Sequence, residues 1–189
     1  MRRIGILGDI GSGKSYVANS FGYPVFNADQ EVEKIYKKNK KVFFKLKKIL
    51  PKYIYSFPIK KYEITNAILS NKNNLKKIIK IVHFEVRKKT KLFLRKNKNR
   101  KFVILDIPLL LENKLNKKND ILVFIDANKK DISKKLKKRK NFNLKLLYKF
   151  KKIQLPLVYK KQKSDFIIKN NFSKKGIKKD INKILDKIL

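Results

Sequence analysis

The chain has 189 residues, the length of one ordinary domain, and its 42% hydrophobic content is enough to bury a core. It has no cysteine and a single histidine, His83, which excludes a disulfide framework, a thiolate metal site and a histidine-based zinc site. The apolar stretch after Met1 is too short for a signal peptide, and no run approaches the ~18 apolar residues of a membrane span. We therefore expect a cytoplasmic protein.

The net charge of +38 raises the question of a nucleic-acid partner. Of the 52 basic residues only six are arginines, the usual readers of base edges, and the lysines are spread over nearly every helical face. The excess of Lys, Asn, Ile and Phe also matches what A+T-rich codons encode. We expect no specific nucleic-acid partner, a monomer or weak homo-oligomer, and a field that speeds the arrival of anionic substrates.

The first expected element is a strand over residues 4–7, followed directly by Gly8-Asp9-Ile10-Gly11-Ser12-Gly13-Lys14-Ser15. This string is a complete G-x-x-x-x-G-K-[ST] phosphate loop, whose glycines let backbone N–H groups curl around phosphates. In such a loop the lysine reaches the β/γ oxygens and the serine hydroxyl ligates Mg²⁺. A plain turn between strand and helix does not need the Lys-Ser pair, so the loop predicts nucleotide binding.

The rest of the chain alternates between short apolar runs and long helical patterns. Further strands are expected at 24–26, 102–105, 121–125 and 166–168, and helical segments at 30–95, with a break over 51–58, at 129–163 and at 177–188. Strands that alternate with helices predict an α/β fold with a parallel sheet flanked by helices. Ligands bind such sheets at the carboxyl ends of the strands.

Two aspartates follow expected strands in a chain that has only 14 carboxylates. Asp29 opens the helical segment after the second strand, and Asp106 comes directly after residues 102–105. Each also has a plainer interpretation. Asp29 suits a helix N-cap, which contributes about 1 kcal/mol, and Asp106 suits the end of a strand before Pro108.

Six segments together resemble the dephospho-coenzyme A kinase family in order and spacing. They are the phosphate loop, Gly22-Tyr23-Pro24-Val25-Phe26-Asn27-Ala28-Asp29, Ile81-Val82-His83-Phe84-Glu85-Val86-Arg87, Asp106-Ile107-Pro108-Leu109-Leu110-Leu111-Glu112, Gln154-Leu155-Pro156-Leu157 and Ser164-Asp165-Phe166-Ile167-Ile168-Lys169-Asn170. The resemblance covers nearly the whole chain. It implies a single P-loop kinase domain with a core of residues 1–29, 100–128 and 164–189, a helical acceptor-binding insertion over 30–99 and a helical lid over 129–163.

The resemblance implies that ATP, with Mg²⁺, phosphorylates the ribose 3′-hydroxyl of dephospho-coenzyme A, the last step of coenzyme A synthesis. It makes Asp29, which orients the attacking hydroxyl, a catalytic residue together with Lys14 and the lid arginine Arg139. It places nucleotide binding on Gly11, Ser12, Gly13, Lys14, Ser15, Tyr16 and Asn170, substrate binding on His83, Arg87, Asp106 and Glu112, and Mg²⁺ binding on Ser15.

Plainer roles stay open for four of these residues. His83 suits a structural position, Glu112 a cap, Asn170 a chain turn and Arg139 a solvated surface site. Two other functions also stay open. One is another small-metabolite or nucleoside-monophosphate kinase, and the other is a basic P-loop ATPase that binds nucleic acid.

Several positions depart from the family pattern. Asp9 replaces a loop glycine, Asn27 the first of two aspartates, Phe84 a proline, Lys60-Lys61 an Asp-Arg pair, and Lys135 and Phe150 lid arginines. Lysine lacks the bidentate fork of arginine, and phenylalanine lacks the charge altogether. We expect a working enzyme that is slow because its lid clamps the transferring phosphate poorly.

Overall fold

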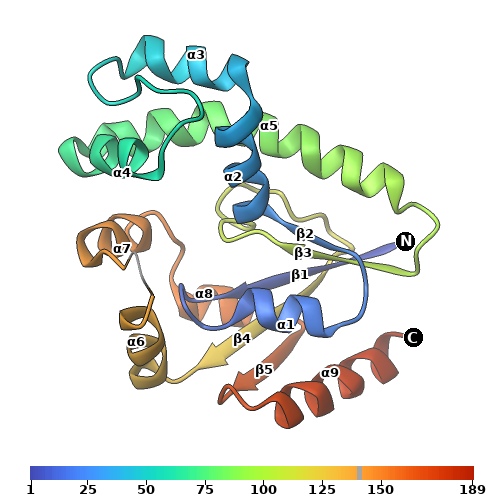
Figure 1. Ribbon diagram of the computed structural model, residues 1–189. Helices are drawn as coiled ribbons and strands as arrows, with labels where there is room; N and C mark the ends of the chain where they lie inside the picture. The colour runs from blue at the N-terminus through green and yellow to red at the C-terminus, as the bar shows by residue number, and fades with distance from the viewer. Residues whose placement is uncertain (140–141) are drawn as a thin grey trace. The chain divides into compact units, whose positions relative to one another are not determined.

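The computed structural model describes residues 1–139 and 142–189; residues 140 and 141, inside the expected lid, lie outside that description. The chain divides into two compact units (Figure 1). The first unit comprises Met1–Asn27, Asn97–Phe142 and Lys151–Leu189, and the second comprises Ala28–Lys96 and Asn143–Phe150.

The first unit is built on a parallel sheet of five strands in the order β2-β3-β1-β4-β5 (Figure 1). The strands are β1 (Arg2–Gly8), β2 (Val25–Asn27), β3 (Phe102–Asp106), β4 (Ile121–Ala127) and β5 (Phe166–Asn170). In the registers of β1 with its two neighbours, Ile4 lies opposite both Ile104 and Ile121. The sheet confirms the predicted α/β fold, with each strand where an apolar run indicated one.

Helices cover the sheet because β1 and β3 are apolar on both faces. Helix α1 (Lys14–Ser20) and helix α9 (Lys174–Ile188) share one buried cluster with Ile4 and Ile6 of β1. Helix α8 (Leu157–Gln162) also packs against β1. Helix α6 (Lys129–Lys137) follows β4. This packing brings the carboxyl ends of the strands, where residues 8, 27, 106 and 170 lie, to one edge of the sheet.

The second unit is helical, and its longest helix, α5 (Lys72–Lys96), contacts three others. These are α2 (Ala28–Lys38), α3 (Lys40–Ile49) and α4 (Lys61–Ser70). Helix α7 (Leu144–Lys151) is joined to α4, because Lys149 Nζ donates to the carbonyl oxygens of Ile68 and Leu69 at 2.6 and 3.2 Å.

The helical segment predicted over residues 30–95 is four helices, and asparagines mark two of the interruptions. Asn39 is the N-cap of α3, since its side chain accepts a hydrogen bond from the Val42 N–H at 3.0 Å. Asn71 separates α4 from α5 with an extended backbone. The predicted break at 51–58 is confirmed, because it lies between the end of α3 and the start of α4.

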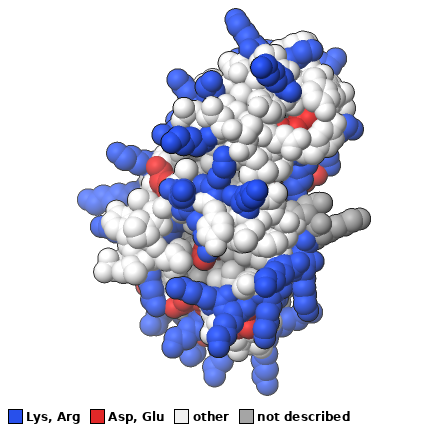
Figure 2. Space-filling model, turned by 90° about the vertical axis from the view of Figure 1, so that its left-hand side faces the viewer, with Lys and Arg blue, Asp and Glu red and all other residues white. Residues whose placement is uncertain are grey.

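Basic side chains project from many places on the face drawn in Figure 2, with uncharged surface and few acidic side chains between them. On this face they do not form a single stripe, as expected for solvated lysines. Within residues 1–139 and 142–189, no helix combines the length and the apolar character needed to cross a membrane.

Candidate active site

The phosphate loop joins β1 to α1 and depends on glycine at two positions. Gly11 and Gly13 have φ angles of +88° and +89°, a region that side chains disfavour. A Cβ atom would lie 2.9 Å from Leu136 Cγ at Gly11 and 2.4 Å from Asn170 Nδ2 at Gly13. Neighbouring elements therefore press on the loop at both glycines, and any larger residue at either position would be strained.

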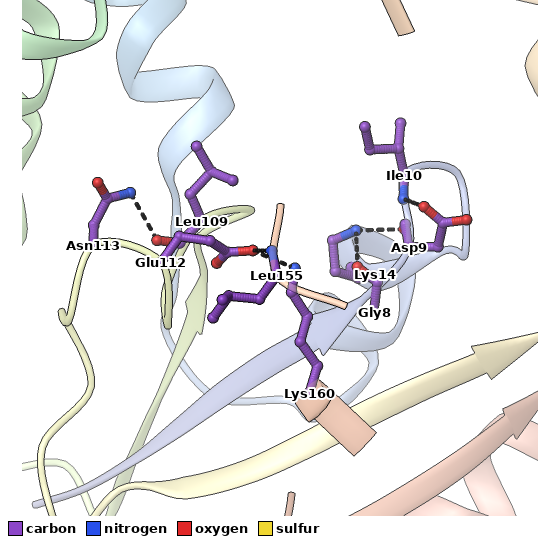
Figure 3. Close-up of polar contacts among 9 residues, drawn as sticks. All are labelled: Gly8, Asp9, Ile10, Lys14, Leu109, Glu112, Asn113, Leu155 and Lys160. Atoms are coloured by element: carbon purple, nitrogen blue, oxygen red, sulfur yellow. Dashed lines mark hydrogen bonds and ion pairs between the residues drawn. The ribbon is translucent and has the colours of Figure 1, made fainter. Parts of the chain in front are cut away.

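Lys14, the first residue of α1, folds its side chain back over the loop (Figure 3). Its Nζ donates to the carbonyl oxygens of Asp9 at 2.6 Å and Gly8 at 3.2 Å. This placement keeps the ammonium group beside the loop, where a phosphate chain would need it.

The Asp9 carboxylate, which replaces a glycine, is directed toward backbone and a lysine. Its Oδ1 accepts from the Ile10 N–H at 2.7 Å (Figure 3), and its Oδ2 lies 3.6 Å from Lys151 Nζ. The lysine offsets part of the negative charge that Asp9 brings to the loop.

Ser15, Asn27 and Asp106 meet at the carboxyl ends of β2 and β3, where Asn27 and Asp106 are register partners. Asn27 Nδ2 donates to Asp106 Oδ2 at 2.6 Å and to Ser15 Oγ at 3.4 Å. Burial raises the pKa of Asp106, while a hydrogen bond from Ser15, the Lys14 charge and Asn27 oppose the rise. The Ser15 hydroxyl and the Asp106 carboxylate are the hard oxygen donors that Mg²⁺ prefers.

Asn170, the last residue of β5, is buried beside the loop. Its Nδ2 donates to the Ser12 carbonyl oxygen at 2.8 Å, and its Oδ1 accepts from the Phe172 N–H at 2.7 Å. A residue expected to contact nucleotide therefore directs its amide to the backbone of the loop itself.

Glu112 lies in the segment after β3 and pairs with a lysine that the sequence analysis did not single out (Figure 3). Its Oε1 accepts from the Leu155 N–H at 3.0 Å and lies 2.6 Å from Lys160 Nζ. The side chains are only 9% and 1% exposed, so this is a buried ion pair. No local pattern separates Lys160 from Lys161, which is exposed and pairs with Asp126.

The remaining candidates in the second unit lie on helices. Asp29 is the second residue of α2, so it lies in the first helical turn and not at an N-cap. His83 and Arg87 lie one turn apart on α5, with His83 half-buried and Arg87 exposed. In the first unit, Arg139 is exposed just beyond the C-cap of α6, and Tyr16 is exposed on α1.

The first unit thus gathers the loop residues 11–15 with Asp106 and Asn170. Within the described part of the chain, no group of three or more His, Asp or Glu side chains could hold a metal ion. Mg²⁺ in phosphate sites is usually held by one or two protein side chains together with the substrate phosphates, which suits Ser15 and Asp106.

Comparisons with known proteins agree along nearly the whole chain. The family model described as dephospho-CoA kinase matches residues 2–175. The dephospho-CoA kinase of Wolbachia sp. subsp. Brugia malayi is 34% identical over 190 residues, which cover 98% of this chain and 97% of that protein. The dephospho-CoA kinase of Rickettsia felis is 31% identical over 188 residues, covering 98% and 96%.

Solved structures share the fold. TT1252 from Thermus thermophilus has a TM-score of 0.77 at 23% identity and covers 100% of this chain and 97% of its own. Dephospho-CoA kinase from Campylobacter jejuni has a TM-score of 0.63 at 23% identity, covering 99% and 97%. Shikimate kinase from Bacteroides thetaiotaomicron, at 11% identity, has a TM-score of 0.55 and covers 99% and 98%.

Proposed function

Because the chain belongs to the dephospho-CoA kinase family, we propose that it transfers the γ-phosphoryl group of ATP to the ribose 3′-hydroxyl of dephospho-CoA. This is the last step of coenzyme A synthesis, and we place it in the cytoplasm. The observation that carries the proposal is a complete phosphate loop in its folded geometry, within a chain that dephospho-CoA kinases match over 98% of its length. A nucleoside-monophosphate kinase or a nucleic-acid-dependent ATPase is not favoured.

ATP binding falls to the phosphate loop and the first turn of α1. We assign it to Gly11, Ser12, Gly13, Lys14, Ser15 and Tyr16, with Asn170 beside them. The backbone N–H groups hold the phosphate oxygens, and the Lys14 ammonium leaves the carbonyls of Gly8 and Asp9 to meet the β/γ phosphates. The loop is already folded, so little reorganisation is needed on binding.

Mg²⁺ fits the Ser15 hydroxyl, with the Asp106 carboxylate as a second oxygen nearby. When bound, the ion neutralises charge on the transferring phosphate. Asn27 would hold Asp106 in place by its 2.6 Å hydrogen bond. The Lys14 charge beside Asp106 favours the ionised carboxylate that this role needs.

In the transfer, the bond between the γ phosphorus and the bridging oxygen breaks as the ribose 3′-oxygen attacks in line. Asp29 accepts the proton of that hydroxyl, and ADP leaves. Arg139 follows α6 in the segment proposed as a lid, and its planar fork would stabilise charge on the phosphoryl group. Lids of this kind also exclude water from the transferring group.

Dephospho-CoA binding is assigned to His83 and Arg87 of α5, with Asp106 and Glu112. The exposed guanidinium of Arg87 suits the phosphates of the substrate, and His83, one turn away, suits its ribose. One oxygen of the Glu112 carboxylate, Oε1, is held by Leu155 and Lys160, so we propose that Glu112 serves substrate binding by fixing the segment that follows β3.

An ADP-coupled assay with dephospho-CoA, comparing Asp29→Asn with Glu31→Gln, tests the proposal. Both acids lie in the first turn of α2, so both variants lose a favourable interaction with the helix N-terminus, and Glu31→Gln also weakens the ion pair of Glu31 with Lys34 at 2.7 Å. Asp29→Asn should lower kcat by about 10² to 10⁴-fold, and Glu31→Gln by less than about twofold. No ADP formation by the wild type at any dephospho-CoA concentration contradicts the function, and equal losses contradict the role of Asp29.

A further inference from the structure

We propose that Asn170 and Phe172 are positioning residues that brace the phosphate loop, so that the turn after β5 sets the affinity for the triphosphate. The inference rests on the proposed function and refines it. Asn170 acts on ATP through the loop and does not contact the adenine.

The two polar groups of the Asn170 side chain are directed to backbone partners. Its Nδ2 donates a hydrogen bond to the Ser12 carbonyl oxygen at 2.8 Å, and its Oδ1 accepts one from the Phe172 N–H at 2.7 Å. Because a peptide bond is planar and trans, holding the Ser12 carbonyl also fixes the direction of the Gly13 N–H, which points the opposite way. Asn170 therefore aims one of the N–H groups that a phosphate loop offers to an anion.

The turn also presses directly on Gly13. A Cβ atom there would lie 2.4 Å from Asn170 Nδ2 and 3.4 Å from Phe172 Cε1. The amide and the aromatic ring thus occupy the space beside the glycine. With both in place, the loop has no room for a side chain at position 13.

Phe172 is itself held in an unfavourable conformation, with a φ angle of +63°. Side chains disfavour this region, and residues remain in it when their surroundings determine it. Asn170 Oδ1 holds its N–H, Gly13 lies against its ring, and Lys135 Nζ of α6 lies 4.0 Å from the ring centroid. The ring of this strained residue lies against the phosphate loop and fills the space beside Gly13.

The test compares Asn170→Asp with Asn171→Asp in the full-length chain. Both variants add one negative charge to the turn after β5, at a buried position for Asn170 and an exposed one for Asn171, and Asn171 also accepts a backbone N–H, that of Ser173 at 3.0 Å. Only Asn170→Asp replaces the donor that holds Ser12 with an acceptor that repels the carbonyl oxygen. The ligands are ATP and inorganic tripolyphosphate, each with Mg²⁺, titrated by calorimetry.

If Asn170 braces the loop, Asn170→Asp should raise the Kd for ATP and the Kd for tripolyphosphate by the same factor, about tenfold or more. Asn171→Asp should change either Kd by less than about twofold. Weaker binding of ATP with unchanged binding of tripolyphosphate overturns the proposal in favour of an adenine contact. Unchanged affinity for both ligands overturns it outright. A wild type that binds tripolyphosphate but does not phosphorylate dephospho-CoA leaves the brace standing and removes the proposed function.

Phe172→Gly keeps the proposal testable if Asn170→Asp does not fold. Glycine relieves the backbone strain, so a purely structural role predicts equal or higher Tm and unchanged kinetics. A brace predicts that KM for ATP rises about fivefold with kcat nearly unchanged, and that Phe172→Tyr, which keeps the ring, stays within about twofold of the wild type. An unchanged KM in Phe172→Gly excludes a role for the ring.

Discussion

The two units place their candidate functional groups in opposite ways. In the first unit, Asp106 and Asn170 are buried at the carboxyl ends of strands, and Ser12 is buried in the phosphate loop. Asn27 donates a hydrogen bond to Asp106, and Asn170 donates one to the Ser12 carbonyl oxygen. In the second unit, Asp29 and Arg87 lie exposed on helices whose apolar sides form the core. The first site depends on backbone conformation and buried polar contacts, whereas the second depends on which side of a helix faces solvent.

Buried charge shows the same difference. In the second unit Glu63 is 1% exposed, and its carboxylate holds a loop by accepting from the Tyr55 N–H at 3.2 Å and from the Ser56 hydroxyl. In the first unit the buried carboxylates Asp106 and Glu112 lie on segments that carry the candidate site, whereas the buried ion pair of Arg3 and Asp120, 2.7 Å apart, joins β1 to the residue before β4. Buried charge therefore serves chain folding in both units, and in the first unit it also places groups of the candidate site.

The largest effect is expected from Lys14→Met, which keeps the length of the side chain and removes its charge. We expect kcat/KM to fall about 10² to 10³-fold, because the variant loses charge stabilisation at the phosphates. Lys47→Met in the second unit, whose ammonium lies 5.6 Å from the Phe43 ring centroid, is the control and should change kcat/KM by less than about twofold. Similar rates in both variants would show that the loop does not carry the chemistry.

Lys160→Met should lower the free energy of unfolding by about 3 kcal/mol, because Glu112 is left buried and without its cation. Lys161→Met breaks an exposed pair with Asp126 and should cost less than about 1 kcal/mol. Urea unfolding measures both. The double variant Lys160→Met/Glu112→Gln should recover part of the loss, and equal costs for the two lysines would contradict the importance of burial.

Asp106→Asn should separate stability from activity. Burial raises the pKa of Asp106 above 3.8, so its stability contribution is present below pH 3.8 and is lost as pH rises through the raised pKa. The variant should therefore be more stable than the wild type at neutral pH, while kcat/KM falls about tenfold. Thermal unfolding from pH 3 to 8 checks the sign, and Asp126→Asn at the end of β4 controls for the lost charge. A variant less stable than the wild type at neutral pH would contradict this account.

The smallest effect is expected from Asp9→Gly, which restores the glycine of the family pattern. The Asp9 charge is directed toward Ile10 N–H and balanced by Lys151 at 3.6 Å, so KM for ATP should fall by no more than about threefold. Adding Lys151→Met should raise KM for ATP more in the wild-type background than in the Asp9→Gly background. In Asp9→Gly the carboxylate is gone, so Lys151 has no negative charge to offset. A change of tenfold or more in Asp9→Gly would show that the carboxylate faces the nucleotide.

Local sequence was informative wherever the physical cause was itself local. The strands could be predicted because apolar runs such as residues 102–105 are buried on both faces. The phosphate loop could be predicted because its glycines are required by positive φ angles in the backbone. The long helical segment was recognised as helical but not divided correctly, since single asparagines such as Asn39 end and begin helices within it. The interpretation of Asp29 as an N-cap was wrong by two residues, because α2 begins at Ala28 and the position before it is Asn27.

The sequence by itself determined the sheet, the nucleotide loop and the family, because periodicity and motif spacing are properties of neighbouring residues. Only the tertiary structure decided that Lys160 is the buried partner of Glu112, and that Asn170 directs its amide to Ser12, 158 residues away. Lysine is the commonest residue type on this surface, and a buried lysine has the same letters around it as an exposed one. Which of them loses its water depends on the segments that fold over it, and these come from distant parts of the chain.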